Sequence, residues 1–281
     1  MWIANEWKDY EVLDCTCGEK LERWDKYTLV RPDPQVIWET PRKHPGWREY
    51  NARYERSHTG GGQWNTKKLP EKWEIHYKEL TFQVKPMNFK HTGIFPEQAA
   101  NWDYIREKVE GAGRPVRVLN LFAYTGGASL AACAAGADTT HVDSVKQVVT
   151  WARENMELSG LDGIRWIVED ALKFVQREVR RGNRYHGIVL DPPAYGRGAN
   201  GEKWILEDNI CEMLECCARL LEPRGAFLVL NLYSMGLSST LARTAVRQAF
   251  GAPRTEQYGE LCFTDRAGKQ LPLGTYYRFT R

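Results

Sequence analysis

The pattern of apolar and polar residues changes near residue 110. From Val116 onward, short apolar runs alternate with segments of helical periodicity, an order typical of βαβ units that build a parallel sheet. Ser144 and Asp170 are suitable helix N-caps. We expect strands at 116–122, 139–143, 164–169, 186–191 and 225–232, and helices at 127–136, 144–159, from 170, at about 204–221 and at about 238–250.

The C-terminal residues predict an antiparallel closure of this sheet. Strand-like segments at 256–263 and 275–279 flank a turn-forming sequence, Asp265-Arg-Ala-Gly268. A hairpin there would add antiparallel strands to an otherwise parallel sheet. We therefore predict an α/β fold with a Rossmann-like, seven-stranded sheet that ends in an antiparallel hairpin.

The first part of the chain predicts a different module. Eight of the 11 tryptophans fall within the first 102 residues. Strand-like runs at 27–30, 73–77 and 80–84 are interrupted by prolines and glycines, as in a small β-rich subdomain. We predict a β-rich, Trp-rich subdomain at 1–85, a connecting segment at 86–110 and the α/β domain at 111–281.

Composition limits the classes of protein. A length of 281 residues suits one large α/β domain with a smaller module. Lys and Arg number 39 against 36 Asp and Glu, so any basic binding site must be local. With 42% hydrophobic and 27% charged residues the chain resembles a globular protein, and no apolar run approaches the roughly 20 residues that span a membrane.

The N-terminus and the cysteines indicate a reduced, cytoplasmic location. The first ten residues include acids and lack the apolar core of a signal peptide. The seven cysteines form no CxxC pair, so a disulfide framework is not expected. Cys15 and Cys17 have no second pair at zinc-finger spacing, and we expect no metal site.

Several candidate ligand-binding residues follow predicted strands. The turn Phe122-Ala-Tyr-Thr-Gly-Gly127 lets the backbone approach a ligand, but it is not the GxGxxG sequence that cradles a pyrophosphate. Asp143 follows Gly126 by 17 residues and could accept hydrogen bonds from ribose hydroxyls. Asp170 could accept from an adenine amino group, or simply cap the next helix.

The most informative motif is Asp191-Pro-Pro-Ala-Tyr195, which follows the fourth predicted strand. The carboxylate of Asp191 offers an acceptor, Pro192 and Pro193 are rigid, and Tyr195 offers a face for stacking on a planar nitrogenous group. The alternative is a strand ended by prolines, with a solvated aspartate.

These motifs resemble those of class I S-adenosylmethionine-dependent methyltransferases, more narrowly the bacterial 23S ribosomal RNA large-subunit methyltransferase group. The resemblance covers about residues 80–281 and rests on Tyr124-Thr-Gly126, on Asp191-Pro-Pro-Ala-Tyr195 and on 92–98, Thr-Gly-Ile-Phe-Pro-Glu-Gln. It implies S-adenosylmethionine as cofactor, with Asp143 on the ribose and Asp170 and Ala171 on the adenine. The residues implied to line the cofactor site are Phe95, Tyr124, Thr125, Gly126, Asp143, Asp170, Ala171 and Asp191.

The candidate catalytic residues favour transfer to a base nitrogen. Methylation of cytosine C5 needs a cysteine nucleophile near the fourth or fifth strand end, and 231–235, Asn-Leu-Tyr-Ser-Met, contains none. A nitrogen acceptor needs only an aligned lone pair in a desolvated pocket. Asp191 would orient the amino group and Tyr195 would stack on the base, although Ala194 separates the prolines from the aromatic residue, unlike the motif of dedicated amino-methyltransferases.

Two segments could hold the substrate, for which ribosomal RNA is our prediction. Residues 40–70 combine seven Lys or Arg with two acids and four aromatic residues, either an RNA-binding pattern or a solvated loop over a Trp-rich core. Arg197, in the glycine-rich loop 196–201 that we expect to be a mobile lid, is the candidate substrate contact. The alternatives are a methyltransferase for a small molecule or a protein, and a non-catalytic nucleotide-binding module.

Overall fold

The structure, a computed structural model, describes residues 1–281 except 5, 58–60, 88, 199–200 and 234–236. The chain forms two compact units. The large unit comprises residues 1–2, 100–261 and 274–281, and the small unit comprises residues 3–99 and 262–273. The boundaries expected from sequence at 85 and 110 stay a prediction.

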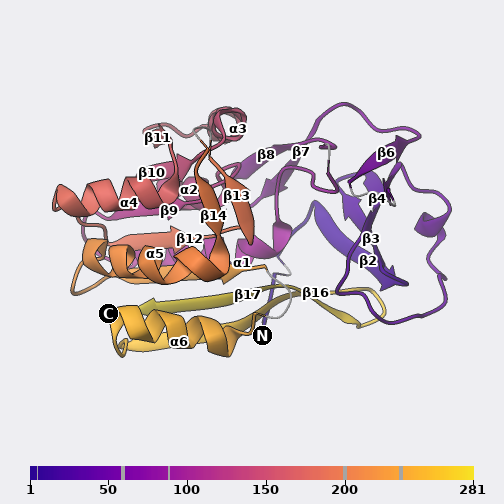
Figure 1. The fold of residues 1–281 in the computed structure, drawn as a ribbon. Coiled ribbons are helices and arrows are strands. Elements are labelled where there is room, and N and C mark those ends of the chain that lie inside the picture. The colour runs from indigo at the N-terminus through magenta and orange to yellow at the C-terminus, as the bar shows by residue number, and fades with distance from the viewer. Residues whose placement is uncertain (5, 58–60, 88, 199–200, 234–236) are drawn as a thin grey trace. The chain divides into compact units, whose positions relative to one another are not determined.

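The large unit is built on a mainly parallel sheet, ordered β1-β16-β17-β15-β12-β9-β10-β11 (Figure 1). The antiparallel pairing of β17 with β15 confirms the C-terminal closure, and two-residue β1 adds an eighth, edge strand. The α/β, Rossmann-like fold predicted from the sequence is confirmed. The strands are β1 (Trp2–Ile3), β9 (Arg117–Leu121), β10 (Asp138–Asp143), β11 (Arg165–Val168), β12 (Gly187–Leu190), β15 (Phe227–Leu232), β16 (Thr255–Thr264) and β17 (Gln270–Thr280).

Among the described residues, six helices cover this sheet (Figure 1). They are α1 (Ala99–Glu110), α2 (Gly127–Ala134), α3 (Lys146–Leu158), α4 (Ala171–Arg180), α5 (Leu206–Leu220) and α6 (Ser239–Phe250). Alternate residues of one strand enter different cores: Leu228 and Leu230 pack with α4, α5 and α6, whereas Val229 packs with α1 and α2. Because both faces are covered, the central strands are continuous apolar runs rather than alternating ones.

Two expectations about helix starts are wrong. Val145, not Ser144, occupies the N-cap position of α3, because Asp143 Oδ1 already accepts the Val145 N–H at 3.0 Å. Trp204 does not begin a helix: it lies in a short strand, β14 (Lys203–Ile205), that pairs with β13 (Tyr195–Arg197). The Asp170 cap is confirmed, since its Oδ1 accepts the Lys173 N–H at 2.9 Å.

The small unit is β-rich. A five-stranded sheet has the order β2-β3-β4-β5-β6, and β7 and β8 form a separate hairpin. A buried ionic cluster lies within it, where Glu22 accepts two hydrogen bonds from Arg31 and its Oε1 lies 3.5 Å from Lys20 Nζ. The strands are β2 (Tyr10–Thr16), β3 (Glu19–Trp24), β4 (Tyr27–Pro32), β5 (Ala52–Arg56), β6 (Gly62–Thr66), β7 (Trp73–Tyr77) and β8 (Leu80–Val84), with short 3-10 turns η1 (Pro45–Trp47) and η2 (Pro96–Gln98).

Within the described residues, no helix is both long and apolar enough to cross a membrane. The cytoplasmic location stays a prediction.

Candidate active site

The candidate site lies at the carboxyl edge of the parallel strands in the large unit. From β9 the chain adds β10 and β11 on one side, then returns to place β12 on the other side of β9. This reversal makes the crevice beyond β9 and β12 the place where open α/β sheets bind ligands. Tyr124, Asp143, Asp170 and Asp191 all follow or end strands at this edge.

The turn after β9 has an unusual backbone. Phe122 and Tyr124 have positive φ angles of 56° and 49°, a backbone conformation that residues other than glycine rarely adopt. Interactions from neighbouring elements hold it: Asp143 Oδ2 accepts the Tyr124 N–H at 2.9 Å, and Asn155 Nδ2 donates to the Thr125 carbonyl at 3.0 Å. Strained backbone that surrounding groups fix in this way is typical of ligand-binding sites.

The two glycines of this turn are required by packing. A Cβ atom on Gly126, whose φ is 94°, would lie 2.9 Å from Leu130 and 3.2 Å from Ala152. A Cβ atom on Gly127 would overlap the indole ring of Trp102 from α1. The sequence suggested only that glycine exposes the backbone to a ligand, so the structure adds a second reason for these residues.

Asp143 combines a structural contact with a capacity for a ligand. Its two carboxylate oxygens accept the N–H groups of Tyr124 and Val145, which fixes the carboxylate at the end of β10. Burial raises the pKa of Asp143 above its usual range, while these backbone hydrogen bonds oppose the rise. Because a carboxylate has about four acceptor directions, it can also accept from a pair of ribose hydroxyls.

Asp170 and Ala171 lie at the start of α4. Asp170 uses Oδ1 as the helix cap, so the simpler of its two predicted roles is observed, and its second oxygen is left for a ligand amino group. The Ala171 side chain is buried in the core among α4, α5 and α6. Only the backbone of Ala171 is therefore suited to contact an adenine, and both cofactor roles stay predictions.

Asp191 is held by a residue to which the sequence assigned no role. Asn231, at the end of β15, donates from Nδ2 to Asp191 Oδ1 at 2.9 Å. Asn231 is 1% exposed, and its own Oδ1 is buried without a hydrogen-bond partner in the described part of the chain. A polar residue inside the apolar run Phe227–Leu232 was the sequence signal for this contact, because buried polar groups normally have a purpose in the fold.

The predicted loop 196–201 is wrong in part, because Gly196 and Arg197 belong to a β-hairpin; its role as a mobile lid stays a prediction. β13 and β14 pair antiparallel, with Tyr195 opposite Ile205 and Arg197 opposite Lys203. Residues 199–200 of the predicted lid lie outside the described residues. Trp204 in β14 donates from Nε1 to the Pro193 carbonyl at 2.7 Å and lies against the Phe122 ring, with centroids 4.7 Å apart. The hairpin thus supports the Asp191–Tyr195 motif.

The remaining catalytic and substrate candidates differ in exposure. Pro192 is buried and Pro193 is exposed. Tyr195 is 51% exposed, and its hydroxyl accepts from Arg197 Nε at 2.7 Å. The structure therefore brings Tyr195 and Arg197 together on one strand, where an exposed ring and a cation lie side by side.

Phe95 belongs to the small unit, where it precedes η2 and its ring centroid lies 5.2 Å from that of His91. Its predicted contact with the cofactor stays a prediction. Among the described residues, no group of three or more His, Cys, Asp or Glu side chains could hold a metal ion.

This arrangement suits a nucleoside ligand without a pyrophosphate. The turn after β9 provides a tight backbone cradle, Asp143 provides acceptors for hydroxyls, and the second oxygen of Asp170 is an acceptor for an amino group. The fold and these residues together define a Rossmann-like domain with a candidate nucleoside site, the arrangement that the sequence motifs predict for a methyltransferase.

Comparisons with known proteins identify the family. The model of the S-adenosylmethionine-dependent methyltransferase family matches residues 48–261. The crystal structure of an S-adenosylmethionine-dependent methyltransferase from Agrobacterium tumefaciens is 38% identical, covers 99% of this chain and 92% of its own, and superposes with a TM-score of 0.94. The chain therefore belongs to the S-adenosylmethionine-dependent methyltransferases and is an enzyme of that kind, with S-adenosylmethionine as its cofactor.

Curated relatives act on ribosomal RNA according to their names. Ribosomal RNA large subunit methyltransferase K/L of Shewanella frigidimarina is 31% identical over 154 residues, which are 53% of this chain and 21% of that protein. Ribosomal RNA large subunit methyltransferase I of Aeromonas salmonicida is 28% identical over 203 residues, 68% of this chain and 47% of that protein. The chain thus spans from about a fifth to about half of the length of these relatives.

Proposed function

We propose that the enzyme methylates a nitrogen atom of a base in RNA, with ribosomal RNA as the first substrate to test. The observation that carries this proposal is the Asp191 carboxylate, held by Asn231 at a strand end and followed by two prolines and the exposed ring of Tyr195. The names of the curated relatives support RNA as the substrate class.

The residues of this chain suggest a simple sequence of events. S-adenosylmethionine supplies an electrophilic methyl group when it is bound. Asp191 would accept an N–H of the base, which turns the nitrogen lone pair toward the methyl group, and Tyr195 would stack on the base. In the transfer an N–C bond would form as the bond between the methyl carbon and sulfur breaks, S-adenosylhomocysteine would leave, and the acceptor nitrogen would lose its proton to water.

A mechanism through a cysteine adduct has little support. The seven cysteines lie on β2, on α2, on α5, on β16 and in the turn after β2. Burial raises the pKa of the Cys133, Cys216 and Cys217 thiols above the usual range, so these groups are poor thiolate nucleophiles. This distribution favours direct transfer to nitrogen over attack at a pyrimidine C6.

The basic, aromatic segment 40–70 favours contacts with phosphates rather than with bases. Trp47 and Tyr54 are buried, so their rings pack inside the small unit and are not accessible to a base. Arg42 and Arg53 both bond to Glu19. Within the described part of this segment, the exposed cations without such a carboxylate partner are suited to an RNA backbone: Lys43, Arg48, Arg56, Lys67 and Lys68.

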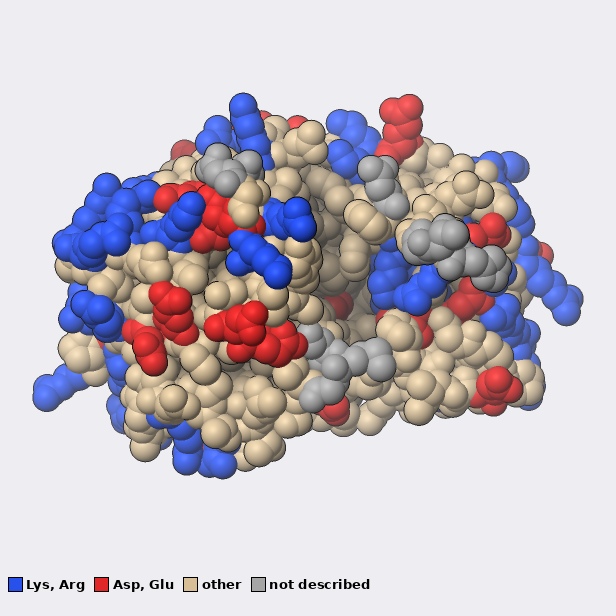
Figure 2. Space-filling view, viewed as in Figure 1, with Lys and Arg blue, Asp and Glu red and all other residues tan. Residues whose placement is uncertain are grey.

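Most of the basic side chains near the end of α4 form hydrogen bonds within the protein. Figure 2 shows Lys and Arg side chains gathered over α4 and acidic side chains over the neighbouring α5. Arg177 bonds to Glu169, Arg181 bonds to Glu178, and Arg184 donates to the Arg219 carbonyl. We therefore assign this cluster no part in binding the substrate.

The test is transfer of a labelled methyl group from S-adenosylmethionine to separated RNA, protein and metabolite fractions, with Asp191→Ala as the control. We expect label in RNA that is absent with Asp191→Ala, and nuclease mapping then identifies the base. Label in the protein or metabolite fraction alone would contradict the proposal and favour a methyltransferase that acts on a protein or a small molecule. Full turnover by Asp191→Asn would contradict the role of this carboxylate in orienting the acceptor.

A further inference from the structure

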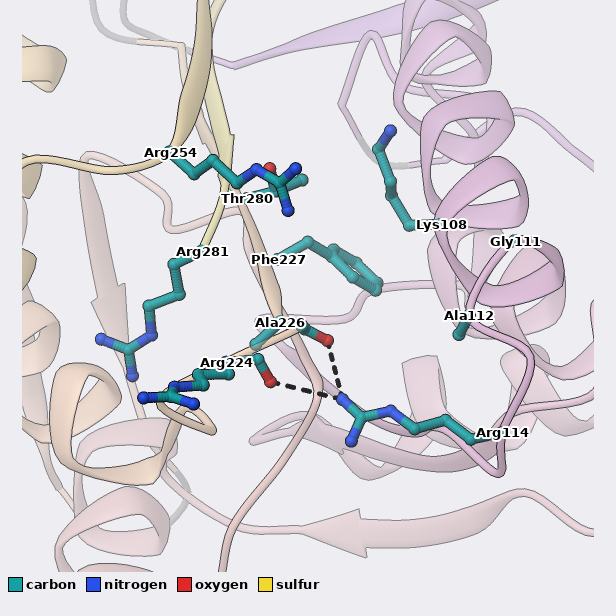
Figure 3. A pocket seen from close by; sticks show the side chains of 11 residues that line it. Lys108, Gly111, Ala112, Arg114, Arg224, Ala226, Phe227, Arg254, Thr280 and Arg281 are labelled. Atoms are coloured by element: carbon teal, nitrogen blue, oxygen red, sulfur yellow. Dashed lines mark hydrogen bonds between the residues drawn. The ribbon is translucent and has the colours of Figure 1, made fainter.

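A strongly basic pocket lies at the amino ends of the parallel strands in the large unit, opposite the carboxyl ends where Asp191 lies. Its volume is about 420 Å³, and 11 residues line it (Figure 3). None of these 11 residues has an acidic side chain. Five of them are cations: Lys108, Arg114, Arg224, Arg254 and Arg281.

The fold gathers these cations from distant parts of the sequence. Lys108 lies in the last turn of α1, and Arg114 precedes β9. Arg224 precedes β15, Arg254 precedes β16, and Arg281 follows antiparallel β17. All four arginines therefore stand at the amino edge of the parallel strands. Since β15 has six residues that rise about 3.3 Å each, the pocket is roughly 20 Å from the carboxyl edge with Asp191.

One wall of the pocket is fixed in place. Arg114 Nη2 donates to the Gly225 carbonyl at 2.9 Å and to the Arg224 carbonyl at 3.3 Å, as the dashed lines of Figure 3 show. Gly225 has a φ of 63°, and a Cβ atom there would lie 2.9 Å from Arg114 Nη2. A glycine at this turn thus allows the guanidinium group to approach the backbone.

The positive charge is only partly neutralised. Lys108 Nζ lies 2.7 Å from the Glu107 carboxylate. Arg281 donates to the Glu222 carbonyl at 2.8 Å, and burial followed by the charge of Arg184 lowers its pKa, an effect that Glu222 opposes. The side chains of Arg224 and Arg254 are exposed and make no hydrogen bond or ion pair within the described residues. Like charges that crowd one another in this way favour a bound counter-anion.

We propose that this pocket binds phosphate groups. Guanidinium groups match the geometry of phosphate oxygens, and a multiply charged phosphate chain can bridge several arginines at once. A volume of about 420 Å³ lies within the range of small-ligand sites. The phosphates come either from a free polyphosphate compound, such as a nucleoside triphosphate, or from an RNA backbone. The proposal does not depend on the methylated substrate, because binding at this edge is measured without methyl transfer.

The experiment compares two double variants of the whole protein. Arg224→Gln with Arg254→Gln removes the two cations of the pocket that make no hydrogen bond or ion pair within the described residues. Arg165→Gln with Arg180→Gln is the matched control, because these two arginines are also exposed and make no hydrogen bond or ion pair among the described residues, but do not line the pocket. Calorimetry with sodium tripolyphosphate should show at least a tenfold loss of affinity for the pocket variant and less than a twofold change for the control.

Labelled single-stranded RNA distinguishes the two sources of phosphate. If fluorescence anisotropy shows weaker binding and a shallower salt dependence only for the pocket variant, the ligand is an RNA backbone. If RNA affinity is unchanged while tripolyphosphate affinity falls, the ligand is a free polyphosphate compound. Equal affinities of the two double variants for both probes would overturn the proposal, whatever the outcome of the methyl-transfer test.

Discussion

Asn231 and Asp191 are 40 residues apart in sequence, and the Asn231 Nδ2 donates to Asp191 Oδ1 at 2.9 Å across the carboxyl ends of β12 and β15. The two strands are parallel neighbours, so their ends meet at the same edge of the sheet. A carboxylate has about four acceptor directions, so Asp191 can accept from a substrate amino group in addition to Asn231. Asn231 therefore positions the residue that we expect to orient the acceptor.

Replacing Asn231 by leucine should impair turnover more than cofactor binding. The substitution keeps the volume of the side chain but removes the donor to Asp191, a hydrogen bond to a charged group of about 1.5–3 kcal/mol. We expect kcat to fall roughly 10- to 100-fold. Steady-state kinetics with RNA, together with calorimetry of S-adenosylhomocysteine, measure the two effects separately. Equal losses of kcat and cofactor affinity would contradict a positioning role.

Trp204 supports the same motif from the β13–β14 hairpin. Replacing it by phenylalanine keeps the aromatic contact with Phe122 but removes the 2.7 Å hydrogen bond to the Pro193 carbonyl. Loss of one neutral hydrogen bond of about 1 kcal/mol should lower kcat/KM roughly fivefold and leave cofactor affinity within twofold. Unchanged kinetics in a variant that binds cofactor normally would show that the hairpin does not position the motif.

The fold was predictable because its central strands are continuous apolar runs that parallel pairing and two covered faces require. The β13–β14 hairpin was not, since its strands have three residues each and a glycine-rich connection that resembles a loop. Trp204 was therefore assigned to a helix. The prediction that Ser144 caps α3 is wrong, because the carboxylate of Asp143, one residue earlier, accepts the Val145 N–H.

The candidate site was predictable in its motifs but not in its contacts. The aspartates at strand ends follow from the order of strands and turns. The partner of Asp191 depends on the relative register of β12 and β15, which a single sequence does not contain. The packing of Gly127 against Trp102 likewise depends on where α1 lies on the sheet.

Replacing Gly127 by alanine should destabilise the protein. A Cβ atom would lie within 3.0 Å of two atoms of the Trp102 ring, so that the ring or α2 must move. Overpacking of this kind costs about 1–3 kcal/mol and should lower Tm by roughly 3–8 °C. Gly196→Ala is the control, because a Cβ there meets Pro193 at 3.6 Å and Trp204 at 3.8 Å, which is ordinary contact. Thermal unfolding followed by tryptophan fluorescence measures both, and equal Tm values would contradict the packing role.

His141 should make the large unit sensitive to acid. Its ring is fully buried on β10, Nδ1 lies 2.9 Å from Ser129 Oγ, and burial lowers its pKa from 6.5 to about 3. Asn120 Nδ2 donates to Ser129 Oγ, which leaves the serine proton for His141 Nδ1. Between pH 6.5 and 3 the unfolded chain therefore binds a proton at His141 that the folded chain does not bind.

The stability that His141 contributes is present above pH 6.5 and is lost as the pH falls toward 3, by about 1.4 kcal/mol per pH unit. His141→Gln retains a polar group for Ser129 but cannot titrate, so its free energy of unfolding should fall less steeply with acid by that amount. Urea unfolding at several values between pH 6.5 and 4.5 measures the two slopes. Other buried groups contribute too, since the pKa of His91 is lowered to about 4 and that of Glu97 is raised to about 7, both mainly by burial. Because they are present in both proteins, the difference between the slopes isolates His141, and parallel curves would show that its ring is protonated in the folded state as readily as in the unfolded chain.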